Sequence, residues 1–301
     1  MRPARGTNRM HMNKGNVLRV DRHATIGQKE LLNEYVNNNK PVIITDSAKQ
    51  WPAVGKWTPE FFKKNYPKVS REVRGEVITL ADQIDRVLAS TPERPAPYPY
   101  NLEVEDYFPD LMKDLEPQLL FGKMDRGASP LMPKILLHGT PIHEVFFGGN
   151  GSSFPFVHYD ALFLHTQITQ IYGDKDFVLY HPNDSQYLYP RSDNEKFSRV
   201  TNVFEPDLVK FPLFAKATPY FETLRQGETI YFPCGWWHTT LTHAPSITYG
   251  RVVLNSLNYD RYLDDKYKRW MGTGQSKLKA NAAYAVGKVV GGVMSTMEAF
   301  R

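Results

Sequence analysis

The feature of this sequence that most constrains its fold is a series of short β-rich segments between residues 134 and 258. Turn-forming pairs such as Gly148-Gly149 and Asn183-Asp184 separate the segments. Many short strands at this spacing predict a double-sheet jelly roll, so we expect a mainly β fold with flanking helices. The segments that read as strands are 134–138, 144–147, 163–171, 177–180, 229–232 and 247–254.

The rest of the chain suggests a division into four parts. These are a flexible basic arm (1–16), an N-terminal α/β region that packs on the core (17–133), the catalytic jelly-roll core (134–258) and a C-terminal helical segment (259–301). In the second part, residues 28–37 read as a helix and 41–45 as a buried strand. Thr58 and Thr79 are typical N-caps of two further helices. The four prolines within 91–99 predict an extended lip.

Composition excludes several classes of protein. The 301 residues carry a formal net charge of +5 and one cysteine, Cys234. A single cysteine excludes an internal disulfide and a cysteine-ligated zinc module. The modest charge favours solvated basic ends over a nucleic-acid surface. We find no apolar leader and no transmembrane segment, and we expect a cytoplasmic protein, or a nuclear one in a eukaryote, in a reducing compartment.

The strongest chemical signal is a possible metal site. His158 and Asp160 are two residues apart, and in a strand such side chains share one face. His238 follows 238 − 158 = 80 residues later, after a Gly turn, an aromatic strand and a Pro-Cys-Gly turn. Two histidines and one carboxylate form the facial triad that holds Fe(II) and leaves coordination positions open. The alternative is that His158 and Asp160 merely pair on a surface strand.

The other histidines are interpreted as structural or solvated. His165 is the strongest exception, because it falls on the predicted strand that follows Asp160. The remaining ones are His11, His23, His138, His143, His181 and His243.

Several sequence blocks together resemble a known family. They are residues 41–45 with 51–61, then 107–111, 158–160, 173–182 and 227–238. At these residues the chain resembles the JmjC-domain oxygenases of the cupin type. It is most similar to the small group around the asparaginyl hydroxylase that inhibits hypoxia-inducible factor. The resemblance covers most of the chain.

The resemblance implies Fe(II), the co-substrate 2-oxoglutarate and O2. It assigns Lys175 to the 5-carboxylate of 2-oxoglutarate, Tyr100 or the nearby Tyr98 to a second contact, and Thr166 to a third. A packing role is open for the tyrosine and for Thr166. Many relatives have Thr or Ser three residues before the first histidine, where this chain has Pro155. The hydroxyl contact to the co-substrate must therefore come from elsewhere.

The expected activity is hydroxylation of a protein or peptide side chain, coupled to decarboxylation of 2-oxoglutarate to succinate and CO2. The alternatives are a tRNA-base or small-molecule hydroxylase, a lysine demethylase, and a non-catalytic cupin binding protein. The carboxylate of Asp160 favours hydroxylation over halogenation. An apolar stripe after Lys277 indicates a helix that forms a homodimer or docks on its own domain.

Overall fold

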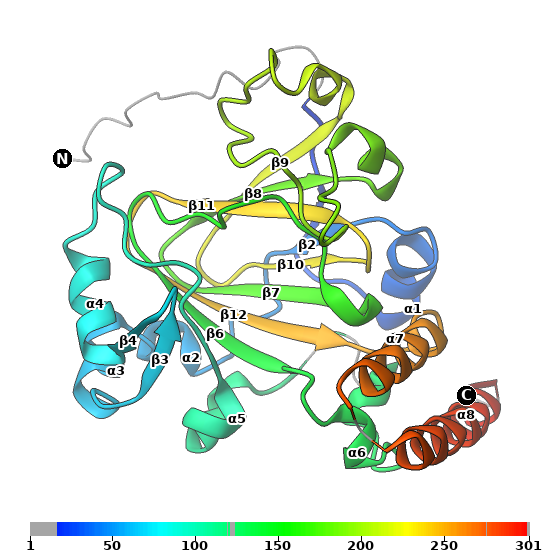
Figure 1. Cartoon of the computed structure of the whole chain (residues 1–301). Helices are drawn as coiled ribbons and strands as arrows, with labels where there is room; N and C mark the ends of the chain where they lie inside the picture. Colours follow the sequence, from blue (N-terminus) through cyan, green and yellow to red (C-terminus); the bar gives the residue numbers. More distant parts are fainter. Residues whose placement is uncertain (1–16, 119, 121–123, 275, 300–301) are drawn as a thin grey trace.

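Two β-sheets face each other, and helices surround them (Figure 1). The computed structural model describes residues 17–118, 120, 124–274 and 276–299, so the predicted basic arm (1–16) lies outside the described residues. The larger sheet has the order β1 (Asp21–His23), β2 (Val42–Ile44), β10 (Thr229–Phe232), β7 (His165–Tyr172), β12 (Ser246–Val253), β6 (His143–Gly148) and β5 (Asn101–Glu103). The smaller sheet has the order β11 (Trp237–Thr242), β8 (Lys175–Tyr180) and β9 (Pro219–Leu224). A separate hairpin pairs β3 (Ser70–Val73) with β4 (Glu76–Thr79).

Alternation of side chains along the strands explains how the two sheets enclose a core. Every residue of β8 is buried, because both faces of this strand are covered. Phe177 and Leu179 point between the sheets and pack with Ile230 of β10. Val178 and Tyr180 point the other way, into a cluster under the segment 188–214. The mainly β jelly roll predicted from the sequence is confirmed.

The N-terminal region covers the outer face of the larger sheet with aromatic side chains. Phe147 of β6 lies 4.9 Å, between ring centroids, from Phe62 in an edge-to-face pair. Phe62 makes a second edge-to-face pair with Phe108, at 5.3 Å. Such pairs contribute about 1 kcal/mol each beyond the burial of their area. The helices of this region are α1 (Gln28–Glu30), continued by a π-helical turn (Leu31–Val36), α2 (Ala53–Lys56), α3 (Pro59–Asn65), α4 (Leu80–Leu88) and α5 (Val104–Tyr107).

Both predicted N-caps are confirmed. The hydroxyl oxygen of Thr58 accepts a hydrogen bond from the amide of Phe61 at 3.1 Å, and α3 begins at the next residue. The hydroxyl of Thr79 accepts from the amide of Asp82, also at 3.1 Å, at the start of α4. Each cap satisfies one of the amide groups that the first helical turn leaves without a partner.

One predicted strand of the core is a helix. Residues 134–138 form helix α6 (Lys134–Leu137) because Leu136 inserts into an apolar cluster beneath the C-terminal helices. An apolar run as short as Ile135-Leu136-Leu137 does not by itself distinguish a helix from a strand. The segment that carries His158 and Asp160 is extended but is not a regular strand. It makes only isolated bridges, from His158 to Phe197 and to His238. The structure also adds β9 and β11, which the sequence pattern did not predict.

The C-terminal segment forms two antiparallel helices, α7 (Tyr259–Gly272) and α8 (Lys277–Ala299) (Figure 1). Glycines that weaken α8 as a helix permit its close approach to α7. A Cβ atom on Gly287 would lie 2.6 Å from Leu263, and one on Gly291 would lie 2.6 Å from Tyr259. One face of α8 therefore docks on its own chain, while Val289 and other apolar residues of the opposite face stay exposed.

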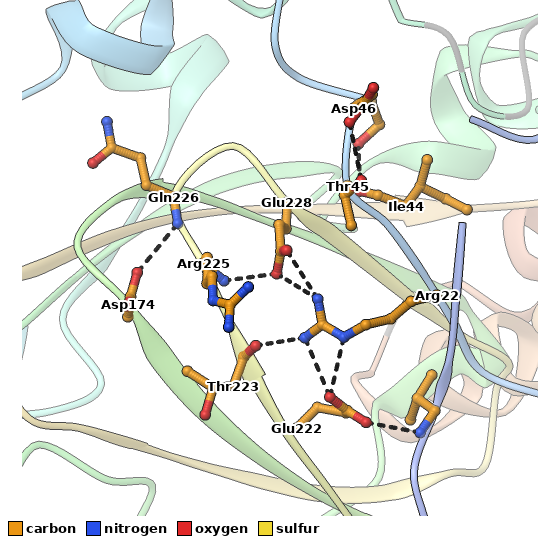
Figure 2. Close-up of polar contacts among 12 residues, drawn as sticks. Arg22, Ile44, Thr45, Asp46, Asp174, Glu222, Thr223, Arg225, Gln226 and Glu228 are labelled. Atoms are coloured by element: carbon orange, nitrogen blue, oxygen red, sulfur yellow. Dashed lines mark hydrogen bonds and ion pairs between the residues drawn. The ribbon is translucent and has the colours of Figure 1, made fainter. Parts of the chain in front are cut away.

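A charged cluster joins the two sheets at the N-terminal strand (Figure 2). The guanidinium of Arg22, on β1 of the larger sheet, donates to Glu222 Oε2 at 3.2 Å and to Glu228 Oε1 at 2.9 Å. It also donates to the carbonyl oxygen of Thr223 at 2.6 Å. Glu222 lies on β9 of the smaller sheet, and its side chain is 1% exposed. Because a buried carboxylate needs such partners, this cluster fixes how the sheets are placed over each other.

Candidate metal and co-substrate site

Three side chains that are predicted metal ligands converge at one end of the space between the sheets. His158 and His238 face each other across a backbone bridge, with His158 N donating to His238 O at 3.1 Å and His238 N donating to His158 O at 2.7 Å. Asp160 follows two residues later in extended backbone, so its side chain turns to the same side. Together these residues are called the triad.

The geometry of the triad fits one metal ion. Asp160 Oδ1 lies 3.9 Å from His158 Nε2 and 3.8 Å from His238 Nε2, and one atom from each residue lies within 4.8 Å of the others. Metal–ligand bonds of about 2.1 Å at right angles place neighbouring ligand atoms about 3 Å apart. A shift of roughly 1–2 Å in the side chains therefore brings the triad to coordination distance.

Neighbouring groups orient the ligands. His238 Nδ1 lies 3.1 Å from the carbonyl oxygen of Trp236. A carbonyl only accepts, so Nδ1 carries the proton and the Nε2 lone pair faces the site. The hydroxyl of Thr166 donates to Asp160 Oδ2 at 2.5 Å, which leaves Oδ1 turned toward the histidines.

The protonation states also suit a metal. Burial lowers the pKa of His158, and the facing His238 lowers it further, so the imidazole is neutral. Burial alone would raise the pKa of Asp160. The opposing histidines and the Thr166 hydroxyl outweigh burial and hold this pKa below its usual value. Neutral imidazoles and an ionised carboxylate are the forms that bind metal.

The triad opens into a pocket of about 300 Å³ between the sheets. Apolar side chains form much of its wall, among them Phe146, Phe154, Leu162, Ile168 and Phe177. The loop 139–142 and Arg269 of α7 also line it, so the C-terminal helices contribute to the site.

Strand registers arrange the pocket wall in three tiers. Residues two positions apart on a strand share a face and lie about 6.6 Å apart. Two side-chain contacts anchor the ends: Lys175 with Thr248 at the deep tier, and Asp160 with Thr166 at the metal tier. The middle tier lies between them and holds Phe177, Thr240, Ile168, Gly250 and Glu144.

The deep tier is dominated by a buried lysine. Lys175 is 2% exposed, and its ammonium donates to Thr248 Oγ1 at 2.8 Å and to Tyr98 Oη at 3.0 Å. No Asp or Glu oxygen of the described residues lies within 4.0 Å of this ammonium. Burial lowers the pKa of Lys175 to about 7. An anion bound here would supply the missing countercharge.

One of the predicted co-substrate residues is placed differently from expectation. Tyr100 lies outside the pocket, where its hydroxyl donates to Ile78 O at 3.1 Å within the N-terminal core. Tyr98, the alternative, lines the pocket beside Lys175. The two tyrosines alternate with prolines in the sequence, so only their tertiary contacts distinguish them. Thr166 does line the pocket, but its hydroxyl proton is directed to Asp160.

The sequence pattern did not single out three further polar groups of the pocket, Glu144, Thr240 and Thr248. Strands β6 and β12, which carry Glu144 and Thr248, were predicted, and β11, which carries Thr240, was not. Which face each side chain presents depends on strand register. Pro155, which replaces the usual hydroxyl residue, lines a neighbouring cleft instead of this pocket.

Comparison with known proteins decides the family. The model of the cupin-like domain matches residues 28–260. The chain belongs to the cupin-like domain family. The predicted cupin and JmjC relationship is confirmed at this level, because several relatives carry Jumonji C or demethylase names.

Three relatives illustrate the range of names in this family. Over 85 residues the chain is 38% identical to the tRNA wybutosine-synthesizing protein 5 of Homo sapiens, covering 28% of this chain and 25% of that protein. It is 26% identical to the lysine-specific demethylase JMJ21 of Arabidopsis thaliana over 256 residues, covering 80% of this chain and 26% of that protein. It is 26% identical to the lysine-specific demethylase 8 of Danio rerio over 222 residues, covering 68% of this chain and 51% of that protein. The chain thus spans between a quarter and about half of these relatives.

Among the described residues, no helix has both the length and the apolar character needed to cross a membrane.

Proposed function

We propose that this protein is an Fe(II)- and 2-oxoglutarate-dependent dioxygenase that hydroxylates a side chain of a protein or peptide. The observation that carries the proposal is the pairing of two features in one pocket. A two-histidine, one-carboxylate triad stands at one end, and a buried lysine that has no acidic partner among the described residues stands two tiers deeper.

Each feature has a defined role in this proposal. The triad would hold the iron, which supplies the redox chemistry that couples decarboxylation of 2-oxoglutarate to oxygen insertion. Lys175, with Tyr98 and Thr248, would bind the 5-carboxylate and so direct the other end of the co-substrate toward the triad. Lys175 and the triad are two tiers apart, about 13 Å along the strands, and the side chains at both tiers extend into the space between them.

The remaining groups of the pocket position the metal ligands and keep water away from the reacting carbon. Thr166 keeps one oxygen of Asp160 away from the metal position, and the Trp236 carbonyl holds the tautomer of His238. The apolar wall formed by residues such as Phe177 and Ile168 excludes water from the reacting carbon. The substrate enters past the loop 139–142 and α7, which border the metal tier.

A protein or peptide substrate agrees with the resemblance to asparaginyl hydroxylases. A tRNA hydroxylase is the second candidate, favoured by the 38% identity to a protein named for tRNA wybutosine synthesis. A lysine demethylase is favoured by the longer but weaker matches. A non-catalytic binding protein is disfavoured because the whole triad is present and converges.

The test measures succinate formed from 2-oxoglutarate with Fe(II), together with iron content. We expect wild type to bind one iron and to form succinate, and His158→Ala to lose both. His243→Ala is the matched control, because His243 pairs with Asp176 outside the pocket. Substrate candidates are screened by mass spectrometry for the gain of one oxygen atom. Wild type that neither retains iron nor forms succinate contradicts the proposal.

We also propose a homodimer through the exposed face of α8. Its apolar side chains include Val289, 68% exposed, and Leu278, 79% exposed. Sedimentation should give a dimer for wild type and a monomer for Val289→Glu. A wild-type monomer would exclude this interface.

A further inference from the structure

Glu144 is a carboxyl group that points into the pocket from the wall formed by β6. Side chains alternate along this strand, and Val145 and Phe147 belong to the aromatic cluster on its outer face. Glu144 and Phe146 therefore face inward, and both line the pocket. Of the acidic residues that line the pocket, Glu144 is the one that does not belong to the triad.

No cation of the described residues neutralises this carboxyl. Oε1 of Glu144 accepts a hydrogen bond from the side-chain amide of Asn101. No Lys, Arg or His nitrogen of the described part of the chain lies within 4.0 Å of its oxygens. The guanidinium of Arg71 is close enough to act on it electrostatically but donates to the carbonyl oxygen of Asn101. Arg269, at the rim of the pocket, lies 3.7 Å from Asp265.

The space in front of the carboxyl is kept open by a glycine. Gly250 is the partner of Glu144 across β6 and β12, and Ile168 is its partner on β7. A Cβ atom on Gly250 would lie 3.1 Å from Phe146 and 3.4 Å from Ile168. Strand β12 therefore presents bare backbone between Glu144 and Ile168, and apolar side chains border the opening.

The tier of Glu144 defines what can reach it. It lies in the middle tier, one step of about 6.6 Å below the level of Thr166 and the triad. A group that enters from the mouth must pass the metal level to meet this carboxyl. The pocket of about 300 Å³ must then hold this group beside the 2-oxoglutarate, which the proposed function extends through the same tier. A long side chain with aliphatic carbons and a terminal charge has this shape, and a short amide side chain does not.

We propose that Glu144 is a specificity-determining residue that binds the positively charged end of a basic substrate side chain, an ammonium or a guanidinium. The aliphatic carbons of that substrate side chain then lie beside the triad, in contact with the apolar wall. Burial is the main reason why the pKa of Glu144 rises to about 7, and a bound cation would favour its ionised form. The inference rests on the proposed function for the chemistry, but its binding step is measured separately.

The probes are blocked tripeptides with arginine, lysine or citrulline between two alanines. Citrulline has the shape of arginine without its charge. Binding is measured by titration calorimetry on the full chain loaded with Mn(II) and 2-oxoglutarate. We expect the arginine or the lysine peptide to bind about 10- to 100-fold more tightly than the citrulline peptide, the range of a charge-assisted hydrogen bond. Glu144→Gln should abolish this preference.

Two further variants separate recognition from folding. Glu105→Gln is the matched control, because the Glu105 carboxylate lies 3.5 Å from His143 outside the pocket and should leave the preference unchanged. Glu144→Lys should reverse the preference, toward a tripeptide with a central glutamate. Thermal melting and 2-oxoglutarate binding, which depends on Lys175, verify that each variant is folded.

The outcomes are distinct. If neither the arginine nor the lysine peptide binds more tightly than the citrulline peptide, or if Glu144→Gln keeps the preference unchanged, the role of Glu144 is overturned. A preserved preference for basic peptides with no iron-dependent succinate formation leaves that role standing and overturns the proposed function instead.

Discussion

The affinity for 2-oxoglutarate should depend on pH through one buried lysine. Burial lowers the pKa of Lys175 to about 7 in the free protein, and its hydrogen-bond partners are the neutral hydroxyls of Tyr98 and Thr248. The bound carboxylate requires the ammonium form. Affinity is therefore highest below pH 7 and falls as the pH rises through 7 and the free lysine loses its proton.

The magnitude follows from the titration. At pH 7 about half of the free protein carries the ammonium, and at pH 9 about one part in a hundred does. Affinity should therefore fall about 50-fold between pH 7 and pH 9, or about 2.3 kcal/mol. Lys175→Met should bind 2-oxoglutarate at least about 100-fold more weakly at pH 6, because an ion pair in a buried site is lost. Its affinity should fall much less than that of wild type between pH 7 and pH 9, because only the ionisation of Glu144 still acts on the anion.

The assay is titration calorimetry of 2-oxoglutarate into protein loaded with Mn(II). Glu144 shares the pocket, and burial raises its pKa to about 7, so its ionisation would also weaken anion binding at higher pH. The titration is therefore repeated with Glu144→Gln, in which the remaining slope belongs to Lys175. Wild-type affinity that is flat from pH 6 to pH 9, or an undiminished slope in Lys175→Met, would refute the reasoning.

Three other predictions test the surroundings of the site and the fold. Thr166→Val removes the hydrogen bond to Asp160 and should weaken Mn(II) binding about 10- to 100-fold in a metal titration, whereas Thr240→Val, in the middle tier, should not. Arg22→Ala leaves Glu222 with fewer partners and should lower the free energy of unfolding in urea by about 2–3 kcal/mol. Arg191→Ala, which breaks an exposed pair with Asp193, should change it by less than about 0.5 kcal/mol, and equal losses would contradict the role of the cluster. Gly291→Ala should lower the melting temperature because its Cβ would meet Tyr259 at 2.6 Å, whereas Gly292→Ala, with open space around it, should raise it; a gain in both would show that α8 does not dock as described.

The sequence by itself determined the features that depend on local chemistry. The caps at Thr58 and Thr79 formed as predicted, because a hydroxyl three residues before a free amide satisfies it in any context. The β-rich segments and the turn residues between them were sufficient to predict most strands of the core. The spacing of His158 and Asp160 brought their side chains to one side, since extended backbone has that geometry even without a regular strand.

Tertiary structure alone decided which residues share the pocket. Tyr98 and Tyr100 each follow a proline in the sequence, yet one contacts Lys175 and the other packs in the N-terminal core. Glu144 became a pocket residue through the register of β6 on β12, and a shift of one residue would have turned it outward. The secondary structure of a short segment such as 134–138 depends on the cluster into which its apolar side chains pack. The physical reason is that propensity acts over a few residues, whereas contacts across strands join segments about a hundred residues apart.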